Sequence, residues 1–307
     1  MKISDIIELR DNYELKKDVE YDSLCNITTE TDIKCLSFAN DEKYIHMACR
    51  KKNIVSLIVP YEYRDNQELM RSGKGIVLSD NPKCLFYMIH NYFTNSLSEI
   101  YCGEIFRTTI GDNCIIHKSA IIAEKNVKIG SNVIIQENVI IREGVEIGDN
   151  VTIMSGAIIG YDACLAGKDM CGNLMPLISA GGVRIGKNVQ IGSYACVSKG
   201  LFPYEITEIE DYSLVGYAVD LSHNSHIGKN TIVLDQSQVC GNTNIEDDVH
   251  VSPQCIISNR LRVGERADIA IGSVVVNNVK KGIRVAGNYA IENSKFLLWH
   301  RKKLRVK

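Results

Sequence analysis

The sequence lacks any long uninterrupted apolar run. Its longest strongly apolar stretch, Ile54–Pro60, is far too short to cross a bilayer. The first residues, MKISDIIELRDNYELKKD, are charged and have no apolar core of the kind that a secretory signal peptide needs. We therefore expect a cytoplasmic protein with no transmembrane segment.

The chain also lacks a strong charge of either sign. Its formal net charge is −2 over 307 residues, so no global basic field points to a nucleic-acid partner. The basic tail 301–307 (RKKLRVK) is local, and we expect it to be solvated or to meet an acidic partner. Apolar residues make up 45% of the chain, which is enough for a sizeable core.

Cysteine is plentiful, but pairing motifs are missing. The eleven cysteines are an odd number and include no C-x-x-C. Such spacing predicts reduced thiols in a cytosolic protein, and Cys114 and Cys255 occupy positions where a small hydrophobic side chain fits. Because no His/Cys/Asp cluster has ligand spacing, we expect no metal site.

What the sequence does contain is a six-residue repeat. Every sixth residue from Ile185 to Val275 is Ile, Val or Leu at fifteen of sixteen positions, and only Pro203 departs. Residues 129–159 and 110–122 share the spacing, with a one-residue slip between them. A helix would place apolar residues three and four apart, and a strand at every second position. A period of six instead predicts a solenoid of short parallel strands and tight turns, with three repeats in each triangular coil of about 18 residues.

Two segments interrupt the repeat. Residues 160–184 are rich in glycine and predict a loop that leaves the coil, as a wall of a site or as a plain insertion. Residues 201–208 contain Pro203 but keep the phase, so we expect a distorted turn there.

The two ends of the chain differ from the solenoid. Residues 1–108 predict an α/β domain, with a helix over 6–17, strands over 53–61 and 74–80, and a helix that begins near Asn81. The solenoid is expected over residues 109–285. Residues 286–307 are expected to form a terminal helix, over 290–304, that caps its open end.

His223 is the strongest candidate for a catalytic residue. It occupies an outward position, and residues 18 apart should stack in neighbouring coils. The column of His223 then contains Glu205, Gly241 and Asn259, and the next column contains Asn224, Asn242 and Arg260. Histidine is the natural general base near neutral pH and could accept the proton of an attacking amine. The alternative is a surface histidine with no function, which is the expectation for His226 and His250.

A carboxylate beside the imidazole would orient it. Glu205 and Asp220 are the candidates for this supporting role.

Several segments carry a resemblance to a known family. They are DIKCLSFANDEKY, IVSLIVP and GIVLSDNPKCLF before the solenoid, and IGYDACLAG, VRIGKNVQIGS, VDLSHNSHIGKN and QVCGNTNIEDDV within it. In this order they resemble the UDP-3-O-acylglucosamine N-acyltransferases of lipid A synthesis. The resemblance implies a left-handed parallel β-helix, a homotrimer with its sites between subunits, and an N-terminal domain that binds uridine.

The same resemblance assigns residues. The histidine of that family's A-H-N segment, its catalytic base, falls on His223. Its uracil-stacking aromatics fall on Phe38 and Tyr44, and its polar uracil contact falls on Asp41 or, with a slip of one residue, on Asn40. Phe38 and Tyr44 could equally be core residues.

Some segments depart from that family. Residues 163–166 (ACLA) replace its Gly/Phe-rich segment, and Arg260 stands where a second histidine is expected. Residues 286–290 (AGNYA) resemble the G-N-P-A of CoA-dependent sugar acetyltransferases, with Tyr289 for proline. A relative that acylates another nucleotide-linked amino sugar, for O-antigen, capsule or protein glycosylation, fits as well as a lipid A enzyme.

The leading hypothesis is an N-acyltransferase that uses an acyl-CoA or an acyl carrier protein thioester and holds no tightly bound cofactor. Asn224 and Arg260 would bind substrate or donor phosphates, and backbone amides would stabilise the oxyanion. The donor is assigned to Gly241, Asn242, Gly287 and Asn288. The alternatives are an O-acetyltransferase, a non-catalytic nucleotide-sugar-binding protein, and a γ-carbonic-anhydrase-like hydrolase with three zinc histidines.

Overall fold

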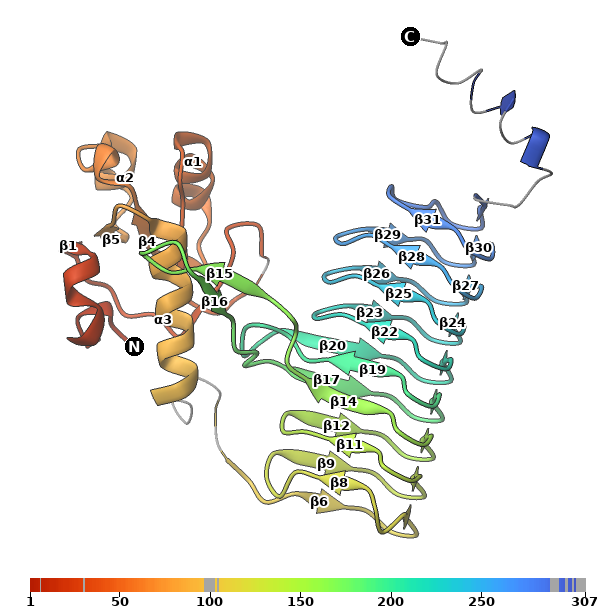
Figure 1. Cartoon of the computed structure of the whole chain (residues 1–307). Helices are drawn as coiled ribbons and strands as arrows, with labels where there is room; N and C mark the ends of the chain where they lie inside the picture. Colours follow the sequence, from red (N-terminus) through yellow and green to blue (C-terminus); the bar gives the residue numbers. More distant parts are fainter. Residues whose placement is uncertain are drawn as a thin grey trace.

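A computed structural model shows an α/β unit beside a long triangular solenoid (Figure 1). The structure describes residues 1–5, 7–29, 31–96, 103, 105–287, 293–295, 298–299 and 301. Most of the predicted terminal helix over 290–304 therefore lies outside the described residues. Among those that are described, no helix is long and apolar enough to cross a membrane.

The α/β unit is built on a five-stranded sheet of order β1-β5-β4-β3-β2. Strands β2 to β5 are parallel, and β1 runs antiparallel to β5. The strands are β1 (Glu14–Lys17), β2 (Ser23–Leu24), β3 (Cys35–Phe38), β4 (Ile54–Val59) and β5 (Gly75–Leu78). The helices are α1 (Glu42–Arg50), α2 (Gln67–Arg71) and α3 (Pro82–Ser96), with 3₁₀ turns η1 (Ile3–Asp5), η2 (Ile7–Asn12) and η3 (Tyr61–Tyr63).

The two strands expected over 53–61 and 74–80 are confirmed as β4 and β5, and the helix expected near Asn81 is α3. The helix expected over 6–17 is wrong, because that segment forms the turn η2 and then strand β1. Pairing of Glu14 with Leu78 at the edge of the sheet explains the difference. Here tertiary pairing overrides local helix propensity.

The solenoid consists of three parallel sheets. Sheet 1 contains β6 (Thr109–Ile110), β9 (Val127–Ile129), β12 (Val145–Ile147), β17 (Gly182–Ile185), β20 (Ile206–Ile209), β23 (His226–Ile227), β26 (Asn244–Ile245) and β29 (Arg262–Val263). Sheet 2 contains β7 (Ile115–Ile116), β10 (Ile134–Ile135), β13 (Thr152–Ile153), β18 (Gln190–Ile191), β21 (Leu214–Val215), β24 (Ile232–Val233), β27 (His250–Val251), β30 (Asp268–Ile269) and β32 (Arg284–Val285). Sheet 3 contains β8 (Ile121–Ile122), β11 (Ile140–Ile141), β14 (Ile158–Tyr161), β19 (Cys196–Ser198), β22 (Asp220–Leu221), β25 (Gln238–Val239), β28 (Ile256–Ile257) and β31 (Val274–Val275).

The six-residue repeat fills the interior as predicted. The fifteen aliphatic residues between Ile185 and Val275 are all at most 6% exposed. Asparagines take left-handed backbone angles at the corners, for example Asn132 (φ 59°) and Asn150 (φ 58°). Asparagine tolerates this conformation better than most residues, and the amide of Asn132 also donates to Asn150 at 3.1 Å.

One coil is six residues longer than a regular coil of 18 residues. Strand pairing aligns Ile185 with Ile209 and Val197 with Leu221, a spacing of 24 residues, whereas a regular coil has 18. The extra repeat leaves the coil between β19 and β20, over residues 199–205. The distorted turn expected around Pro203 is therefore a whole repeat looped out of the solenoid.

The α/β unit is attached to the solenoid through two excursions. The predicted loop over 160–184 is confirmed; it forms the hairpin β15 (Ala166–Lys168) and β16 (Leu174–Pro176), beside α3 in Figure 1. His90 of α3 is fully buried, and its Nε2 lies 2.7 Å from the carbonyl oxygen of Ile178. Burial lowers the pKa of His90 to about 4, so its imidazole is neutral there.

The looped-out repeat supplies the second attachment. Phe202 is fully buried, with its ring centroid 5.7 Å from that of Phe86 and 5.1 Å from that of His90. Residues from both parts of the chain thus share one hydrophobic cluster.

Candidate functional site

His223 lies at the corner between β22 and β23, where Leu221 and Ser225 on either side point inward and are buried. Its imidazole rests against Gly241 of the next coil. A Cβ atom built on Gly241 would lie 2.4 Å from Nε2 of His223, far inside contact distance. Only glycine at this position leaves room for the ring.

One ring nitrogen of His223 lacks a partner. Nδ1 of His223 is enclosed and has no hydrogen-bond partner within the described part of the chain. An unpaired buried polar atom costs about 1–3 kcal/mol, and such exceptions often mark functional groups. Burial, and then the nearby positive charge of Arg260, lower the pKa of His223. The imidazole is therefore neutral and able to accept a proton near pH 7.

Replacing Arg260 by asparagine is expected to shift the acid limb of the plot of kcat/KM against pH. A base with a lowered pKa is active above that pKa, and its activity is lost as the pH falls through it. Without the positive charge of Arg260, the pKa of His223 should rise toward the ordinary value of about 6.5. The acid limb of kcat/KM should then move to higher pH.

Arg266→Asn is the matched control for this shift. Arg266 also has a left-handed φ, at another corner, and pairs with Glu265 at 3.2 Å. A profile that moves equally in both variants, or in neither, would contradict a direct effect of Arg260 on His223.

Glu205 does not orient the imidazole, which corrects the prediction. The 24-residue coil places Lys199 in the column of His223, because Leu221 aligns with Val197. Glu205 is where the looped-out repeat returns to the coil, and its carboxylate accepts the backbone N–H groups of Leu201 (3.0 Å) and Phe202 (3.3 Å). It stabilises the loop.

Asp220 also bonds elsewhere, so the second expected support for His223 is corrected as well. Its Oδ1 accepts the hydroxyl of Tyr161 at 2.6 Å, and its Oδ2 accepts the amide of Gln238 at 3.1 Å. Tyr161 was not singled out from the sequence, since its partner is 59 residues away.

Asn224, Asn242 and Arg260 form the adjacent column, as predicted. All three have left-handed backbone angles, and the amide of Asn224 donates to Asn242 at 2.9 Å. The backbone N–H of Asn242 donates to the carbonyl of His223 at 2.9 Å. This column therefore fixes the coil next to the imidazole and leaves Arg260 as the charge beside it.

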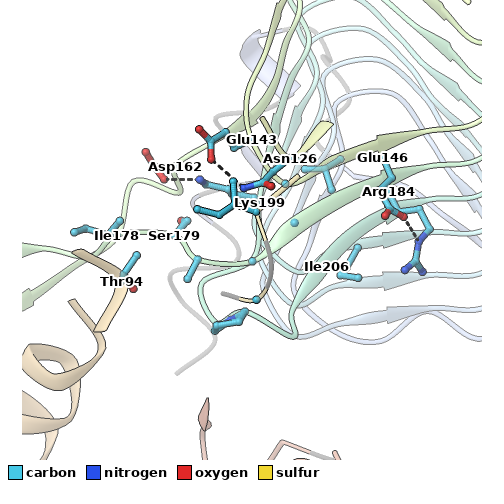
Figure 2. A pocket seen from close by; sticks show the side chains of 18 of the residues that line it. Thr94, Asn126, Glu143, Glu146, Asp162, Ile178, Ser179, Arg184, Lys199 and Ile206 are labelled. Atoms are coloured by element: carbon cyan, nitrogen blue, oxygen red, sulfur yellow. Dashed lines mark hydrogen bonds and ion pairs between the residues drawn. The ribbon is translucent and has the colours of Figure 1, made fainter. Parts of the chain in front are cut away.

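A cleft of about 440 Å³ lies on the corner between sheets 3 and 1, nearer to β6 than His223 is. It opens between the solenoid and the segment that follows α3. Figure 2 shows Lys199 next to Asp162 and Asn126 next to Glu143 in its wall. Nζ of Lys199 is 3.4 Å from Asp162, and only 16% of its side chain is exposed. Lys199 was not predicted from the sequence. It lines this cleft and lies one coil below His223, in the same column.

The four residues assigned to the nucleobase come together at the turn from β3 to α1. Tyr44 is 40% exposed, Asn40 is exposed, and Asp41 caps α1 by accepting the backbone N–H of Tyr44 at 3.0 Å. Phe38 is half-buried against the ring of Phe86 at 5.0 Å. The turn lies at the carboxyl edge of the parallel strands, where α/β sheets bind ligands. The packing of Phe38 also supports a core role.

The solenoid is similar to known proteins in sequence and in structure. Residues 126–161 match the sequence family described as "Bacterial transferase hexapeptide (six repeats)". The solenoid carries hexapeptide repeats. In structure it is similar to UDP-N-acetylglucosamine acyltransferase from Campylobacter jejuni, with a TM-score of 0.53 and 23% identity over 63% of this chain and 78% of that one. That likeness shows the fold, a left-handed β-helix.

Two curated relatives are similar in sequence to this chain. One is UDP-3-O-acylglucosamine N-acyltransferase of Shewanella denitrificans, 30% identical over 50% of this chain and 44% of the relative. The other is UDP-3-O-acylglucosamine N-acyltransferase 2 of Legionella pneumophila strain Paris, 37% identical over 46% of this chain and 40% of the relative. The chain thus spans less than half the length of these relatives.

The other predicted residues do not join the His223 cluster. Gly287 follows β32, three strands beyond β24 in sheet 2, or about 14 Å along the hexapeptide solenoid. Asn288 lies outside the described residues. Both ring nitrogens of His226 lie 2.8 Å from an oxygen, one of Asn244 and one of Glu210, and His250 faces Asp268 at 3.5 Å. Within the described part of the chain, no three His, Cys, Asp or Glu side chains gather as a metal site would need.

Proposed function

We propose that this protein is an N-acyltransferase that acylates the amino group of a nucleotide-linked amino sugar. The amine nitrogen attacks the thioester carbonyl carbon, and His223 takes the amine proton as the new C–N bond forms. The C–S bond then breaks, and the thiolate leaves with the proton returned by the imidazolium. The products are an amide and a free thiol.

The observation that carries this proposal is the unpaired, neutral imidazole of His223, held against Gly241 at an outward corner of the solenoid. A general base must be deprotonated at working pH. The lowered pKa of His223 meets this condition, and its side chain is partly exposed at the corner. The names of the sequence relatives support the reaction class and the nucleotide-sugar acceptor.

The first test is an assay of thiol release. Acetyl-CoA, longer acyl-CoAs and acyl carrier protein thioesters would be combined with UDP- and dTDP-linked amino sugars. His223→Ala should lower kcat by about 10²–10⁴-fold, the usual contribution of a general base. His250→Ala is the matched control, because His250 lies in β27 on sheet 2 and faces Asp268. Its kcat should stay within about threefold of the wild-type value, since surface pairs contribute little.

Each other outcome has a distinct meaning. Turnover that survives in His223→Ala would remove this residue as the base. A product with an ester in place of an amide would identify an O-acyltransferase. Nucleotide-sugar binding without turnover of any pair would favour the non-catalytic alternative.

We also propose that the α/β unit, residues 1–108, holds the nucleotide at the β3–α1 turn, and that three copies of the chain assemble through sheets 2 and 3. Exposed isoleucines on their outward faces support the assembly, among them Ile115 (66% exposed) and Ile121 (62%). The particle mass in solution, by light scattering, tests it.

A further inference from the structure

We infer that the acyl group transferred is short, of acetyl size, and that Tyr161 and Asp220 set this limit. The inference rests on the proposed function and adds the class of acyl donor to it.

The outward column of sheet 3 changes character at the coil of His223. Below that coil the column is aliphatic, and above it the column becomes aliphatic again. From the lower coils upward it reads Ile121, Ile140, Ile158, Cys196, Asp220, Gln238, Ile256 and Val274. The column is thus polar at Asp220, on the coil of His223, and at Gln238, on the coil above, while Cys196 lies on the coil below.

A hydrogen-bonded bridge closes this side of the site. Tyr161 ends β14, two coils below Asp220, and pairs with Ser198 on the coil between them. Its hydroxyl donates to Asp220 at 2.6 Å. Gln238 of the coil above donates to the other carboxylate oxygen at 3.1 Å. Burial, and then Asp220, raise the pKa of Tyr161, so its hydroxyl remains a donor. The bridge spans four coils, from β14 to β25, and would block an acyl chain that extended from His223 along sheet 3.

The opposite side offers no apolar groove either. On sheet 1, His226 lies between Glu210 and Asn244, at 2.8 Å from each. At the corner itself, Asn224 donates to Asn242. The outward residues that surround His223 on its own coil and on the next one are all polar, apart from Cys240 and Gly241.

This lining selects against long chains. Each methylene buried against apolar surface raises affinity about fourfold, and that gain is absent against polar walls, whose groups would lose water or their existing partners. An acetyl group needs only the space beside the imidazole.

The experiment compares kcat/KM for acetyl-, butyryl- and octanoyl-CoA, and for carrier-protein thioesters of the same lengths. The wild-type protein should favour acetyl over octanoyl by at least about 100-fold. Tyr161→Ala should raise the octanoyl-to-acetyl ratio by about tenfold or more, because it opens the bridge. Tyr161→Phe keeps the ring and should keep most of the preference. Tyr217→Ala, at an exposed position, is the control and should leave the ratio unchanged.

Two results would overturn the inference. One is a wild-type protein that uses octanoyl donors as well as acetyl donors. The other is a Tyr161→Ala variant with an unaltered ratio, which would remove the bridge as the determinant. If no thioester is turned over, the proposed function fails separately, and calorimetry with the same CoA series still measures the chain-length preference.

Discussion

Gly241→Ala is expected to lower kcat/KM by about 100-fold while the fold stays intact. The new methyl group would stand 2.4 Å from the present position of Nε2 of His223, so the imidazole must move. A displacement of about 1 Å at a catalytic group is enough for a loss of this size. Steady-state kinetics of thiol release measure the effect, and the melting temperature reports on the fold.

Gly167→Ala serves as the control for this substitution. A Cβ atom at Gly167 would meet its nearest neighbour, an atom of the Tyr87 ring, at 3.5 Å, an ordinary contact. Its activity should match that of the wild-type protein. Full activity in Gly241→Ala would mean that His223 does not act from the position described.

Phe202→Ala is expected to reduce the free energy of unfolding by about 3–5 kcal/mol, the usual cost of truncating a buried aromatic residue. Phe202 is fully buried and packs against Phe86, His90 and Tyr204. These contacts attach the α/β unit to the solenoid. Truncation of Phe202 should therefore also separate the unfolding transition of the α/β unit from that of the solenoid. Urea denaturation followed by circular dichroism would show the loss.

Leu174→Ala tests whether truncation in an excursion is harmful by itself. Leu174 lies in β16 and is 77% exposed, so its loss should change stability by less than about 0.5 kcal/mol. Equal destabilisation by both variants would show that Phe202 does not hold the two parts together.

The solenoid could be predicted from the sequence because its energetics repeat. Each interior position needs one aliphatic side chain, so the period appears in the letters themselves, and Val239 or Ile257 could be placed inside without any structure. The one-residue slip was also visible, and it aligns Ile110 with Ile129. The first strand, β1, was not visible, since a distant edge of the sheet fixes it.

The candidate site was predictable only in part. His223, Gly241 and Arg260 lie above the irregular coil, where a spacing of 18 residues holds. Glu205 was misplaced because a looped-out repeat keeps the phase of six and yet shifts the stacking partner by six residues. The bridge from Tyr161 to Asp220 crosses this irregularity, so no fixed spacing could reveal it.

The stacking of coils determines where the solenoid opens locally. The strands of each coil pair only with those of the neighbouring coils, so the solenoid should open from its ends. Strand β23, next to His223, has β26 and β29 on one side and β20, β17, β12, β9 and β6 on the other. Backbone amides near His223 should therefore exchange with solvent deuterium more slowly than those of β6 or β32. The proposed catalytic base would then lie where the solenoid opens least often.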